Sequence, residues 1–158
     1  RRRGLDEAHP RPGRPGHRAP RHATWARVSQ ASLIRVPAWA PGEAAEIELR
    51  SPDAIANPYL VFAIALACAM DGIRHRTEPP QPLDESYTTY DDLELLRRGV
   101  TRLPGTLGEA LTAFAEDAVV QETIGPYIAS QLLTLKRAEW EAYRSHVSPW
   151  EFARYVDA

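Results

Sequence analysis

Polar and apolar residues alternate in two short segments in the first third of the chain. Residues 32–36 favour a strand that ends at Pro37, and residues 44–50 set polar against apolar side chains at every second position. Pro41-Gly42 lies between these segments and is typical of a turn. The pattern predicts an antiparallel hairpin with one packed face and one polar face, and such a hairpin is expected to complete a larger sheet.

The next segment is dominated by apolar residues and predicts a long helix. Asn57 provides an N-cap and Pro58 the first helical position, and the helix is expected to reach about His75. Its side chains are apolar on nearly every side as far as Met70, which is typical of a helix that is buried all round. One hairpin and a few amphipathic helices offer too few partners for such a helix, so the pattern indicates part of a larger fold.

Shorter helical segments and one further long helix are predicted in the remainder, which makes the chain an α+β protein. Thr106 with Glu109, and Ser148 with Glu151, have the spacing of capping boxes. The expected elements are a short helix within 87–98, a helix from Thr106 to about Ala118, a short turn ending at Gly125, the longest helix from Pro126 to about Ser145, and a last short helix after Ser148. On the longest helix, the side chains expected to face the core are Ile128, Leu132, Leu135 and Trp140.

The size and charge of the chain fit one globular domain. It has 158 residues, of which 44% are hydrophobic and 25% charged, with a formal net charge of -2. This balance argues against a nucleic-acid surface and against a polybasic membrane patch. The apolar run over 59–70 is shorter than the about 20 residues that a membrane span needs, and no signal peptide is visible, so the sequence predicts a cytoplasmic protein.

The single cysteine, Cys68, lies inside this apolar run. No charged residue flanks it closely, so we expect a small buried hydrophobic residue and not a nucleophile. Because the chain has no second cysteine, it forms no internal disulfide, which fits a reducing compartment.

The composition changes abruptly near residue 23. Residues 1–22 are rich in Arg, Pro, Gly and His and cannot bury enough apolar surface to offset the entropy of ordering. We therefore expect residues 1–23 to be disordered or foreign to the fold, and residues 24–158 to form the domain. A basic nucleic-acid-binding tail is the alternative, but the segment lacks interleaved aromatic residues. The histidines of this segment do not have metal-ligand spacing: His9, His17 and His22.

The polar face of the predicted hairpin gathers one carboxylate and two guanidinium groups. Glu48 and Arg50 are two residues apart on a strand and therefore point to the same face, which Arg35 on the preceding strand can also reach. Such a group suits a divalent cation and anionic substrate groups. On spacing alone, an exposed face with a solvated ion pair fits equally well.

Several segments in the same order carry a resemblance to a known family. They are residues 25–37 (WARVSQASLIRVP), 47–60 (IELRSPDAIANPYL) and 72–85 (GIRHRTEPPQPLDE), followed by LPGTLGEAL and the ending KRAEWEAYRSHVSPWEFARYVD. Together they resemble the C-terminal part of the glutamine synthetase catalytic domain, over roughly residues 24–158. The Lys-Arg-x-Glu-Trp-x-x-Tyr-Arg segment is similar to the bacterial branches that include γ-glutamyl ligases.

The resemblance implies an ATP-dependent ligase that forms γ-glutamyl phosphate from glutamate and then transfers the acyl group to ammonia. By position, Glu48 resembles a ligand of the Mg²⁺ or Mn²⁺ that bridges the nucleotide phosphates. Arg50 resembles the catalytic arginine that contacts glutamate and the transferred phosphoryl group, and Arg35 resembles an arginine that contacts the phosphates of ATP. The resemblance also implies a homo-oligomeric ring. The alternatives are a γ-glutamyl ligase that uses a polyamine or another amine, and a non-catalytic interaction module.

Two positions depart from the family pattern. Gln30 stands where the family has an arginine, and Glu46 stands where it has a basic residue two positions before the metal glutamate. The family's other metal ligands lie upstream of the matching region, and nothing in residues 1–22 resembles them. A single carboxylate cannot hold a catalytic magnesium ion, so we expect the isolated chain to be an inactive, truncated or mis-started copy.

Overall fold

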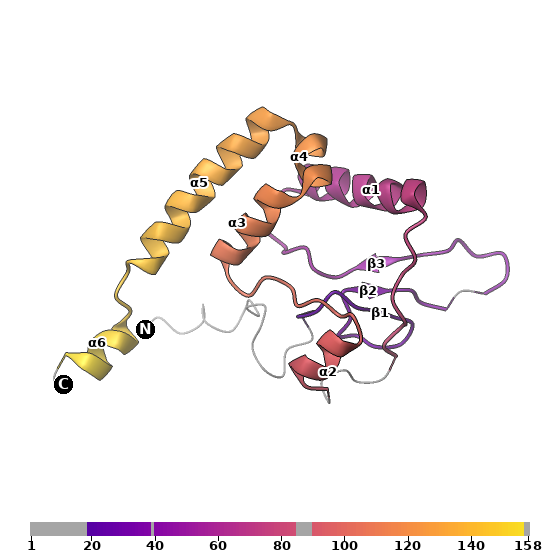
Figure 1. The fold of residues 1–158 in the computed structure, drawn as a ribbon, viewed down its shortest axis with the longest axis horizontal. Helices are drawn as coiled ribbons and strands as arrows, with labels where there is room; N and C mark the ends of the chain where they lie inside the picture. The colour runs from indigo at the N-terminus through magenta and orange to yellow at the C-terminus, as the bar shows by residue number, and fades with distance from the viewer. Residues whose placement is uncertain (1–18, 39, 85–89, 157–158) are drawn as a thin grey trace, which may run out of the picture.

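The computed structural model describes residues 19–38, 40–84 and 90–156 of the chain. Within these residues three short strands precede six helices, which is the α+β order that the sequence predicts (Figure 1). The strands are β1 (Trp25–Ala26), β2 (Ile34–Arg35) and β3 (Glu48–Leu49). The helices are α1 (Pro58–His75), α2 (Asp92–Arg97), α3 (Leu107–Glu116), α4 (Ala118–Ile124), α5 (Pro126–Arg144) and α6 (Pro149–Tyr155).

The three strands form one sheet in the order β1-β2-β3. The predicted antiparallel pairing is confirmed between β2 and β3, whereas β1 pairs with β2 in parallel and was not predicted. The predicted strand over 44–50 is too long, because the strand itself covers Glu48–Leu49 alone among these residues. The turn at Pro41-Gly42 is confirmed, with Gly42 at a φ of 92° and a hydrogen bond from Glu43 N to Ala40 O of 3.0 Å.

Helix α1 begins where its cap signals predict. The Asn57 side chain accepts hydrogen bonds from the backbone N–H groups of Tyr59 and Leu60, at 3.0 and 3.4 Å. The helix ends at His75, after which Arg76 adopts a left-handed conformation at a φ of 51°. Among the described helices, none combines the length and the hydropathy that crossing a bilayer requires.

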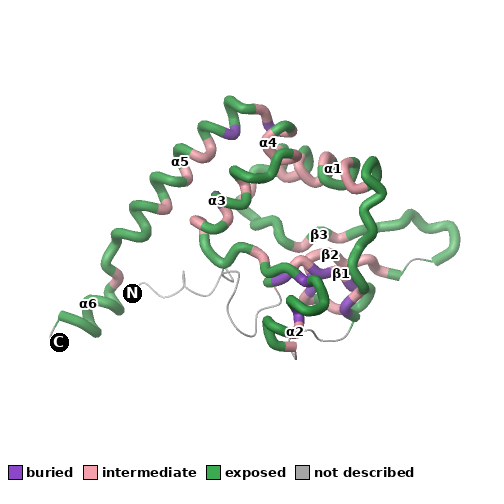
Figure 2. The backbone as a smooth tube through the Cα atoms, viewed as in Figure 1, coloured by how far each residue is buried: buried purple, intermediate pink, exposed green. Residues whose placement is uncertain are grey.

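The prediction that α1 is buried all round is wrong for this chain. No residue of α1 is fully buried, and the exposed side chains on it include Tyr59, Phe62, Leu66 and Ile73. The expectation of a buried Cys68 is also wrong, since this residue is exposed. The physical reason is that α1 packs against α4 alone among the described elements, so one side of an apolar helix is covered and the others face solvent (Figure 2).

The helices α3, α4 and α5 pack against one another and join α1 through α4. Their buried side chains are Leu111, Ile124 and Ala129. Of the α5 residues expected in the core, Leu132 and Trp140 are half-buried, whereas Ile128 and Leu135 are exposed. The covered face of α5 therefore runs through Ala129 instead of Ile128. Trp140 lies over Gly108 so closely that a Cβ there would come within 2.7 Å of the indole nitrogen.

The predicted caps form to different degrees. Ser148 and Glu151 make a complete capping box at the start of α6. Thr106 caps α3 by accepting from Glu109 N at 3.1 Å, but the Glu109 carboxylate accepts from Gly105 N instead of Thr106 N.

A small core beside the sheet holds α2 in place. Leu83, Leu95 and Val100 pack together, with Ala31 and Tyr90 partly buried against them. Figure 2 shows buried residues gathered near the strands and α2. Ala26 of β1 is also fully buried.

Residues 21–23 pair with residues 101–103. Ala23 N donates to Thr101 O at 2.8 Å and Leu103 N donates to Arg21 O at 2.9 Å, on either side of a bridge between His22 and Arg102. Residues 1–18 lie outside the described residues, as do His9 and His17. The assignment of residues 1–23 as a segment apart from the domain stays a prediction, although residues 21–23 make these pairings.

His22 predicts a loss of stability on mild acidification. Its imidazole is buried, with Nε2 3.5 Å from Asp92 and with Arg21 and Arg102 as the other charged groups that act on it. Burial lowers the pKa of His22 below 6.5, although Asp92 opposes this shift. The unfolded chain therefore binds the proton more readily, so stability is full above pH 6.5 and falls as the pH decreases from there toward 5. The measurement is the denaturation midpoint between pH 7 and 5.

The control for this prediction is His22→Gln, which removes the titration while keeping a polar side chain of similar size. The variant is expected to show a flatter pH dependence over the same interval, whatever its stability at pH 7. An unchanged slope would assign the pH dependence to other groups.

Candidate active site

The polar face of the sheet is built from one row of residues across the three strands. The register places Ala26, Arg35 and Glu48 side by side, one from each strand, so their side chains share a face. Arg35 Nε donates to Glu48 Oε2 at 2.9 Å and Arg35 Nη2 donates to Oε1 at 2.5 Å. The side chain of Arg35 is 28% exposed and that of Glu48 is 42% exposed, so a ligand from solution can reach the pair.

Arg50 extends the same face by one step along β3. Its backbone N donates to Leu33 O at 2.9 Å, which continues the pairing beyond Leu49 and fixes its position. Its Nη1 atom is buried and has no hydrogen-bond partner among the described residues. Burying a guanidinium nitrogen without a hydrogen-bond partner costs free energy, so this side chain is suited to bind an anionic ligand.

The structure thus brings two of the three predicted site residues into contact. Arg35 and Glu48 form a bidentate pair, while the Arg50 side chain makes no hydrogen bond to either of them. The two positions that depart from the family pattern, Gln30 and Glu46, are both exposed. The roles assigned to Arg35, Glu48 and Arg50 remain predictions.

The described residues supply at most part of a metal site. A carboxylate oxygen of Glu48 is a suitable ligand for Mg²⁺ or Mn²⁺. No group of three or more His, Cys, Asp or Glu side chains in the described part of the chain could hold a metal ion. A complete coordination sphere therefore does not fit these residues, and Glu48 is already engaged by Arg35.

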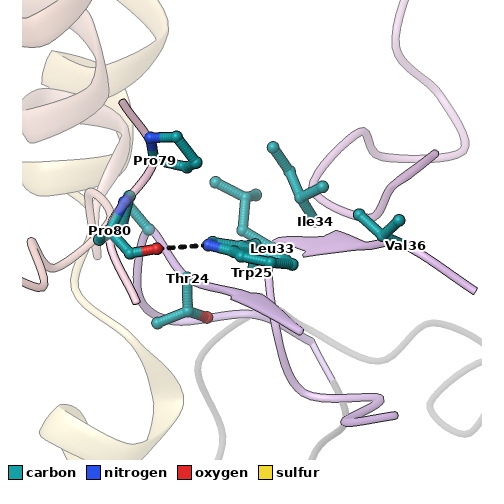
Figure 3. Close-up of a pocket in the computed structure, with 8 residues that line it drawn as sticks. Thr24, Trp25, Leu33, Ile34, Val36, Pro79 and Pro80 are labelled. Atoms are coloured by element: carbon teal, nitrogen blue, oxygen red, sulfur yellow. Dashed lines mark hydrogen bonds between the residues drawn. The ribbon is translucent and has the colours of Figure 1, made fainter. Parts of the chain in front are cut away.

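The opposite face of the sheet carries an apolar pocket that sequence reasoning missed. Its volume is about 430 Å³, and Figure 3 shows the indole of Trp25 within it, beside Ile34 of the neighbouring strand. The other residues that line the pocket are Ala23, Thr24, Leu33, Val36, Pro79 and Pro80. Because the parallel pairing of β1 creates this face, no short-range sequence signal could have located it.

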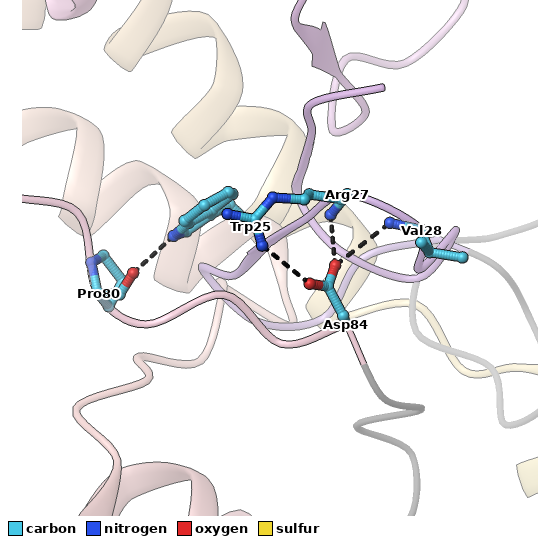
Figure 4. A network of polar contacts seen from close by, with 5 residues as sticks. All are labelled: Trp25, Arg27, Val28, Pro80 and Asp84. Carbon is cyan, nitrogen blue, oxygen red and sulfur yellow. Dashed lines mark hydrogen bonds and ion pairs between the residues drawn. The ribbon is translucent and has the colours of Figure 1, made fainter. Parts of the chain in front are cut away.

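A carboxylate clamp fixes the edge strand β1 (Figure 4). Asp84 Oδ1 accepts from the backbone N–H groups of Arg27 and Val28 at 2.6 and 3.3 Å, and Oδ2 lies 3.3 Å from Arg27 Nη1. The backbone hydrogen bond from Arg27 lowers the pKa of Asp84. Trp25 Nε1 also donates to Pro80 O at 2.6 Å. The loop before α2 therefore holds β1, and with it the row that contains Arg35.

Comparison with known proteins decides the family. Residues 13–155 match the family model described as glutamine synthetase, catalytic domain. The chain belongs to the glutamine synthetase family. The resemblance inferred from the sequence is thereby confirmed, together with the α+β fold of the C-terminal part of that catalytic domain.

The relatives include glutamine synthetases of archaea. The chain is 37% identical over 142 residues to the glutamine synthetase of Methanosarcina mazei. This match covers 90% of this chain and 32% of that protein. The chain is also 38% identical over 154 residues to the glutamine synthetase of Pyrococcus abyssi. That match covers 89% of this chain and 34% of that protein.

A solved structure of a related protein has the same fold. The structure described as "Apo GmaS without ligand" is similar at a TM-score of 0.71 and 32% identity, and the match covers 89% of this chain and 31% of that one. The chain thus spans about a third of the length of the glutamine synthetase relatives it matches.

Proposed function

We propose that this chain contributes one wall of the active site of an ATP-dependent ligase that joins ammonia to the γ-carboxylate of glutamate. The observation that carries the proposal is the cluster of Arg35, Glu48 and Arg50 on the β2–β3 hairpin of a glutamine synthetase family chain. In this reaction a glutamate oxygen attacks the γ-phosphorus of ATP and ADP leaves. The nitrogen of ammonia then attacks the acyl carbon of γ-glutamyl phosphate, inorganic phosphate leaves, and the nitrogen loses a proton.

The two arginines are assigned to the negative charges of this chemistry. Arg50 contacts glutamate and the transferred phosphoryl group, a role supported by its buried Nη1, which has no hydrogen-bond partner among the described residues. Arg35 contacts a phosphate of ATP through donors on the guanidinium. Glu48 provides one oxygen ligand to Mg²⁺ or Mn²⁺, which neutralises phosphate charge when bound. The described residues do not supply the remaining ligands of such an ion.

The proposal extends to the intact protein. Residues 24–158 form one part of the catalytic domain, and the family relationship supports a homo-oligomeric ring that works in the cytoplasm. A second candidate is a γ-glutamyl ligase that uses a polyamine or another amine in place of ammonia. The segment over 136–144, which is similar to the ligase branches, favours this candidate.

The test is release of inorganic phosphate from ATP by an enzyme that joins this chain to the remainder of the family's catalytic domain. With glutamate and Mg²⁺ present, we expect release that requires ammonia and is absent when either glutamate or Mg²⁺ is omitted. Release with putrescine but not with ammonia would replace the proposal by the second candidate. The absence of release with every amine, together with retained oligomer formation, would favour a non-catalytic interaction module.

A further inference from the structure

Helix α1 has two faces with different surroundings. The half-buried side chains Leu60, Ile64 and Ala67 lie on one face, and α4 is the described element that packs against this helix. A second row, on the other side of the helix, recurs every three or four residues, so its members share one face. We call this row the apolar stripe. Its members are all exposed: Tyr59 (83%), Phe62 (73%), Leu66 (66%), Met70 (39%) and Ile73 (69%).

The apolar stripe is long and carries no charge along most of its length. The first charged side chain of α1 is Asp71, near the end of the helix. At a rise of 1.5 Å per residue, the distance along the helix from Tyr59 to Ile73 is about 21 Å. Single exposed apolar side chains are normal on a protein surface, whereas a continuous exposed row marks a contact surface.

An exposed leucine elsewhere in the chain has different neighbours. Leu96 of α2 is 66% exposed, as Leu66 is, but it shares its short helix with Asp92, Glu94 and Arg97. These charged side chains are typical of a helix face that remains in water. The lack of charge around Leu66 therefore separates the apolar stripe from an ordinary solvated surface.

A second apolar surface is uncovered on the sheet. The register aligns Trp25, Ile34 and Leu49 in one row across the three strands, and the first two line the apolar pocket (Figure 3). Leu49 is 42% exposed on the edge strand β3. No contact joins α1 to the strands in the described ranges, so these two surfaces are separate. A partner that covers both is a body of domain size and not a single helix.

We propose that the apolar stripe is the surface on which the rest of the catalytic domain docks, as part of the same polypeptide or as a separate one. The match to the Methanosarcina mazei glutamine synthetase covers 90% of this chain but 32% of that protein. About two thirds of the relative therefore lies outside the match, and this portion is the occupant. It is large enough to cover both the stripe and the sheet. The inference rests on membership of the family and not on the ligase activity.

The occupant presents an apolar face to the stripe. Burial of a large apolar side chain stabilises a contact in proportion to the area removed from water, so Tyr59, Phe62 and Leu66 supply much of the docking free energy. A charged side chain in the middle of the stripe would lose its hydration without gaining a partner. Leu66, at the centre of the row, is therefore the most sensitive position.

The first test is co-expression of the tagged 158-residue chain with the part of the Methanosarcina mazei glutamine synthetase that lies outside the match. The two polypeptides are expected to co-purify. Leu66→Glu is expected to reduce recovery of the untagged polypeptide at least tenfold, because burial of the carboxylate opposes docking. Leu96→Glu is the matched control, since it makes the same change at an equally exposed leucine, and is expected to change recovery by less than twofold.

Circular dichroism of each variant establishes that the helices form. Full recovery with Leu66→Glu, or an equal loss with Leu96→Glu, would overturn the proposal. A dimer of the 158-residue chain that Leu66→Glu dissociates, with no recovery of the second polypeptide, would assign the stripe to a second copy instead.

The second test decides the matter if the parent polypeptides do not co-purify. Leu66→Cys is introduced together with Cys68→Ser, so that position 66 carries the one thiol of the chain. Its rate of reaction with a water-soluble thiol reagent is compared in the 158-residue chain and in the same chain joined to the cysteine-free remainder of the relative. Joining is expected to slow the reaction at least 100-fold at position 66 and less than threefold for Leu96→Cys. Equal rates at position 66 in the two proteins would refute docking on the stripe.

Neither test uses turnover, so the docking surface and the proposed function can fail separately. An assembled protein that protects position 66 but releases no phosphate would retain the docking surface and lose the ligase. An active joined enzyme in which position 66 reacts as fast as in the chain alone would retain the ligase and lose the docking surface.

Discussion

Replacement of Glu48 by alanine is expected to lower the turnover of the ligase by about 100-fold or more, the range seen when a metal site or its electrostatic support is lost. The variant removes the one carboxylate on the polar face of the hairpin that the structure places in contact with Arg35. Because alanine has no carboxylate, the affinity for Mg²⁺ or Mn²⁺ is expected to fall. Arg35 loses its partner but keeps its guanidinium, so its phosphate contacts are expected to persist. The measurement is steady-state phosphate release by the enzyme that contains the whole catalytic domain.

Glu46→Ala is the matched control for this prediction. Glu46 carries the same charge on the same segment but is exposed and forms no ion pair among the described residues. Its replacement is expected to leave turnover within a few-fold of the parent enzyme. Normal turnover in Glu48→Ala would remove Glu48 from the site.

Arg50→Gln is expected to lower kcat by about 100- to 1000-fold, the cost of removing one donor that stabilises charge in a transition state. The side chain has a buried Nη1 with no hydrogen-bond partner in the part of the chain that the structure describes, which supports the proposed role in binding an anionic ligand. Glutamine retains a polar group at this position but has neither the charge nor the reach of the guanidinium. The measurement compares kcat and the KM for glutamate in the same enzyme.

Two further variants separate charge from geometry at this position. Arg50→Lys keeps the charge but loses the planar fork, so we expect an activity between those of the parent and Arg50→Gln. Arg74→Gln makes the same charge change at an exposed position of α1 and is expected to have no measurable effect. Equal activities in Arg50→Gln and Arg74→Gln would rule out a direct role for Arg50.

Local rules predicted the elements whose signals lie within a few residues. Asn57 and Pro58 fix the start of α1, and Ser148 with Glu151 fixes that of α6, because these caps satisfy backbone groups one turn away. The turn at Gly42 likewise depends on one left-handed residue. The parallel pairing of β1 with β2 instead joins residues ten apart, such as Ile34 N to Thr24 O, and no local pattern encodes it.

Burial was the least predictable property. The apolar pattern of α1 shows which side chains can be buried but not what covers them, and Phe62 and Cys68 are exposed. On α5 the covered face follows Ala129, and Trp140 lies close over Gly108 of α3. Such contacts depend on tertiary geometry, which helical periodicity alone does not contain.

The candidate site was predicted in part for a similar reason. The two-residue period of a strand places Glu48 and Arg50 on one face, and the hairpin brings Arg35 to it. The sequence could not show that Arg35 and Glu48 form an ion pair, nor that Arg50 has a buried Nη1 without a hydrogen-bond partner in the described ranges. Those properties depend on side-chain conformations and on the register of two strands.

The most direct measurement of the central claim is a crystal structure of the complete catalytic domain with glutamate, Mg²⁺ and a non-hydrolysable ATP analogue. The account predicts a metal ion on the Glu48 carboxylate, phosphate oxygens within hydrogen-bond distance of Arg35, and the glutamate or γ-phosphate group against Arg50. Nucleotide and metal bound elsewhere, with the Arg35–Glu48 pair intact and facing solvent, would contradict it.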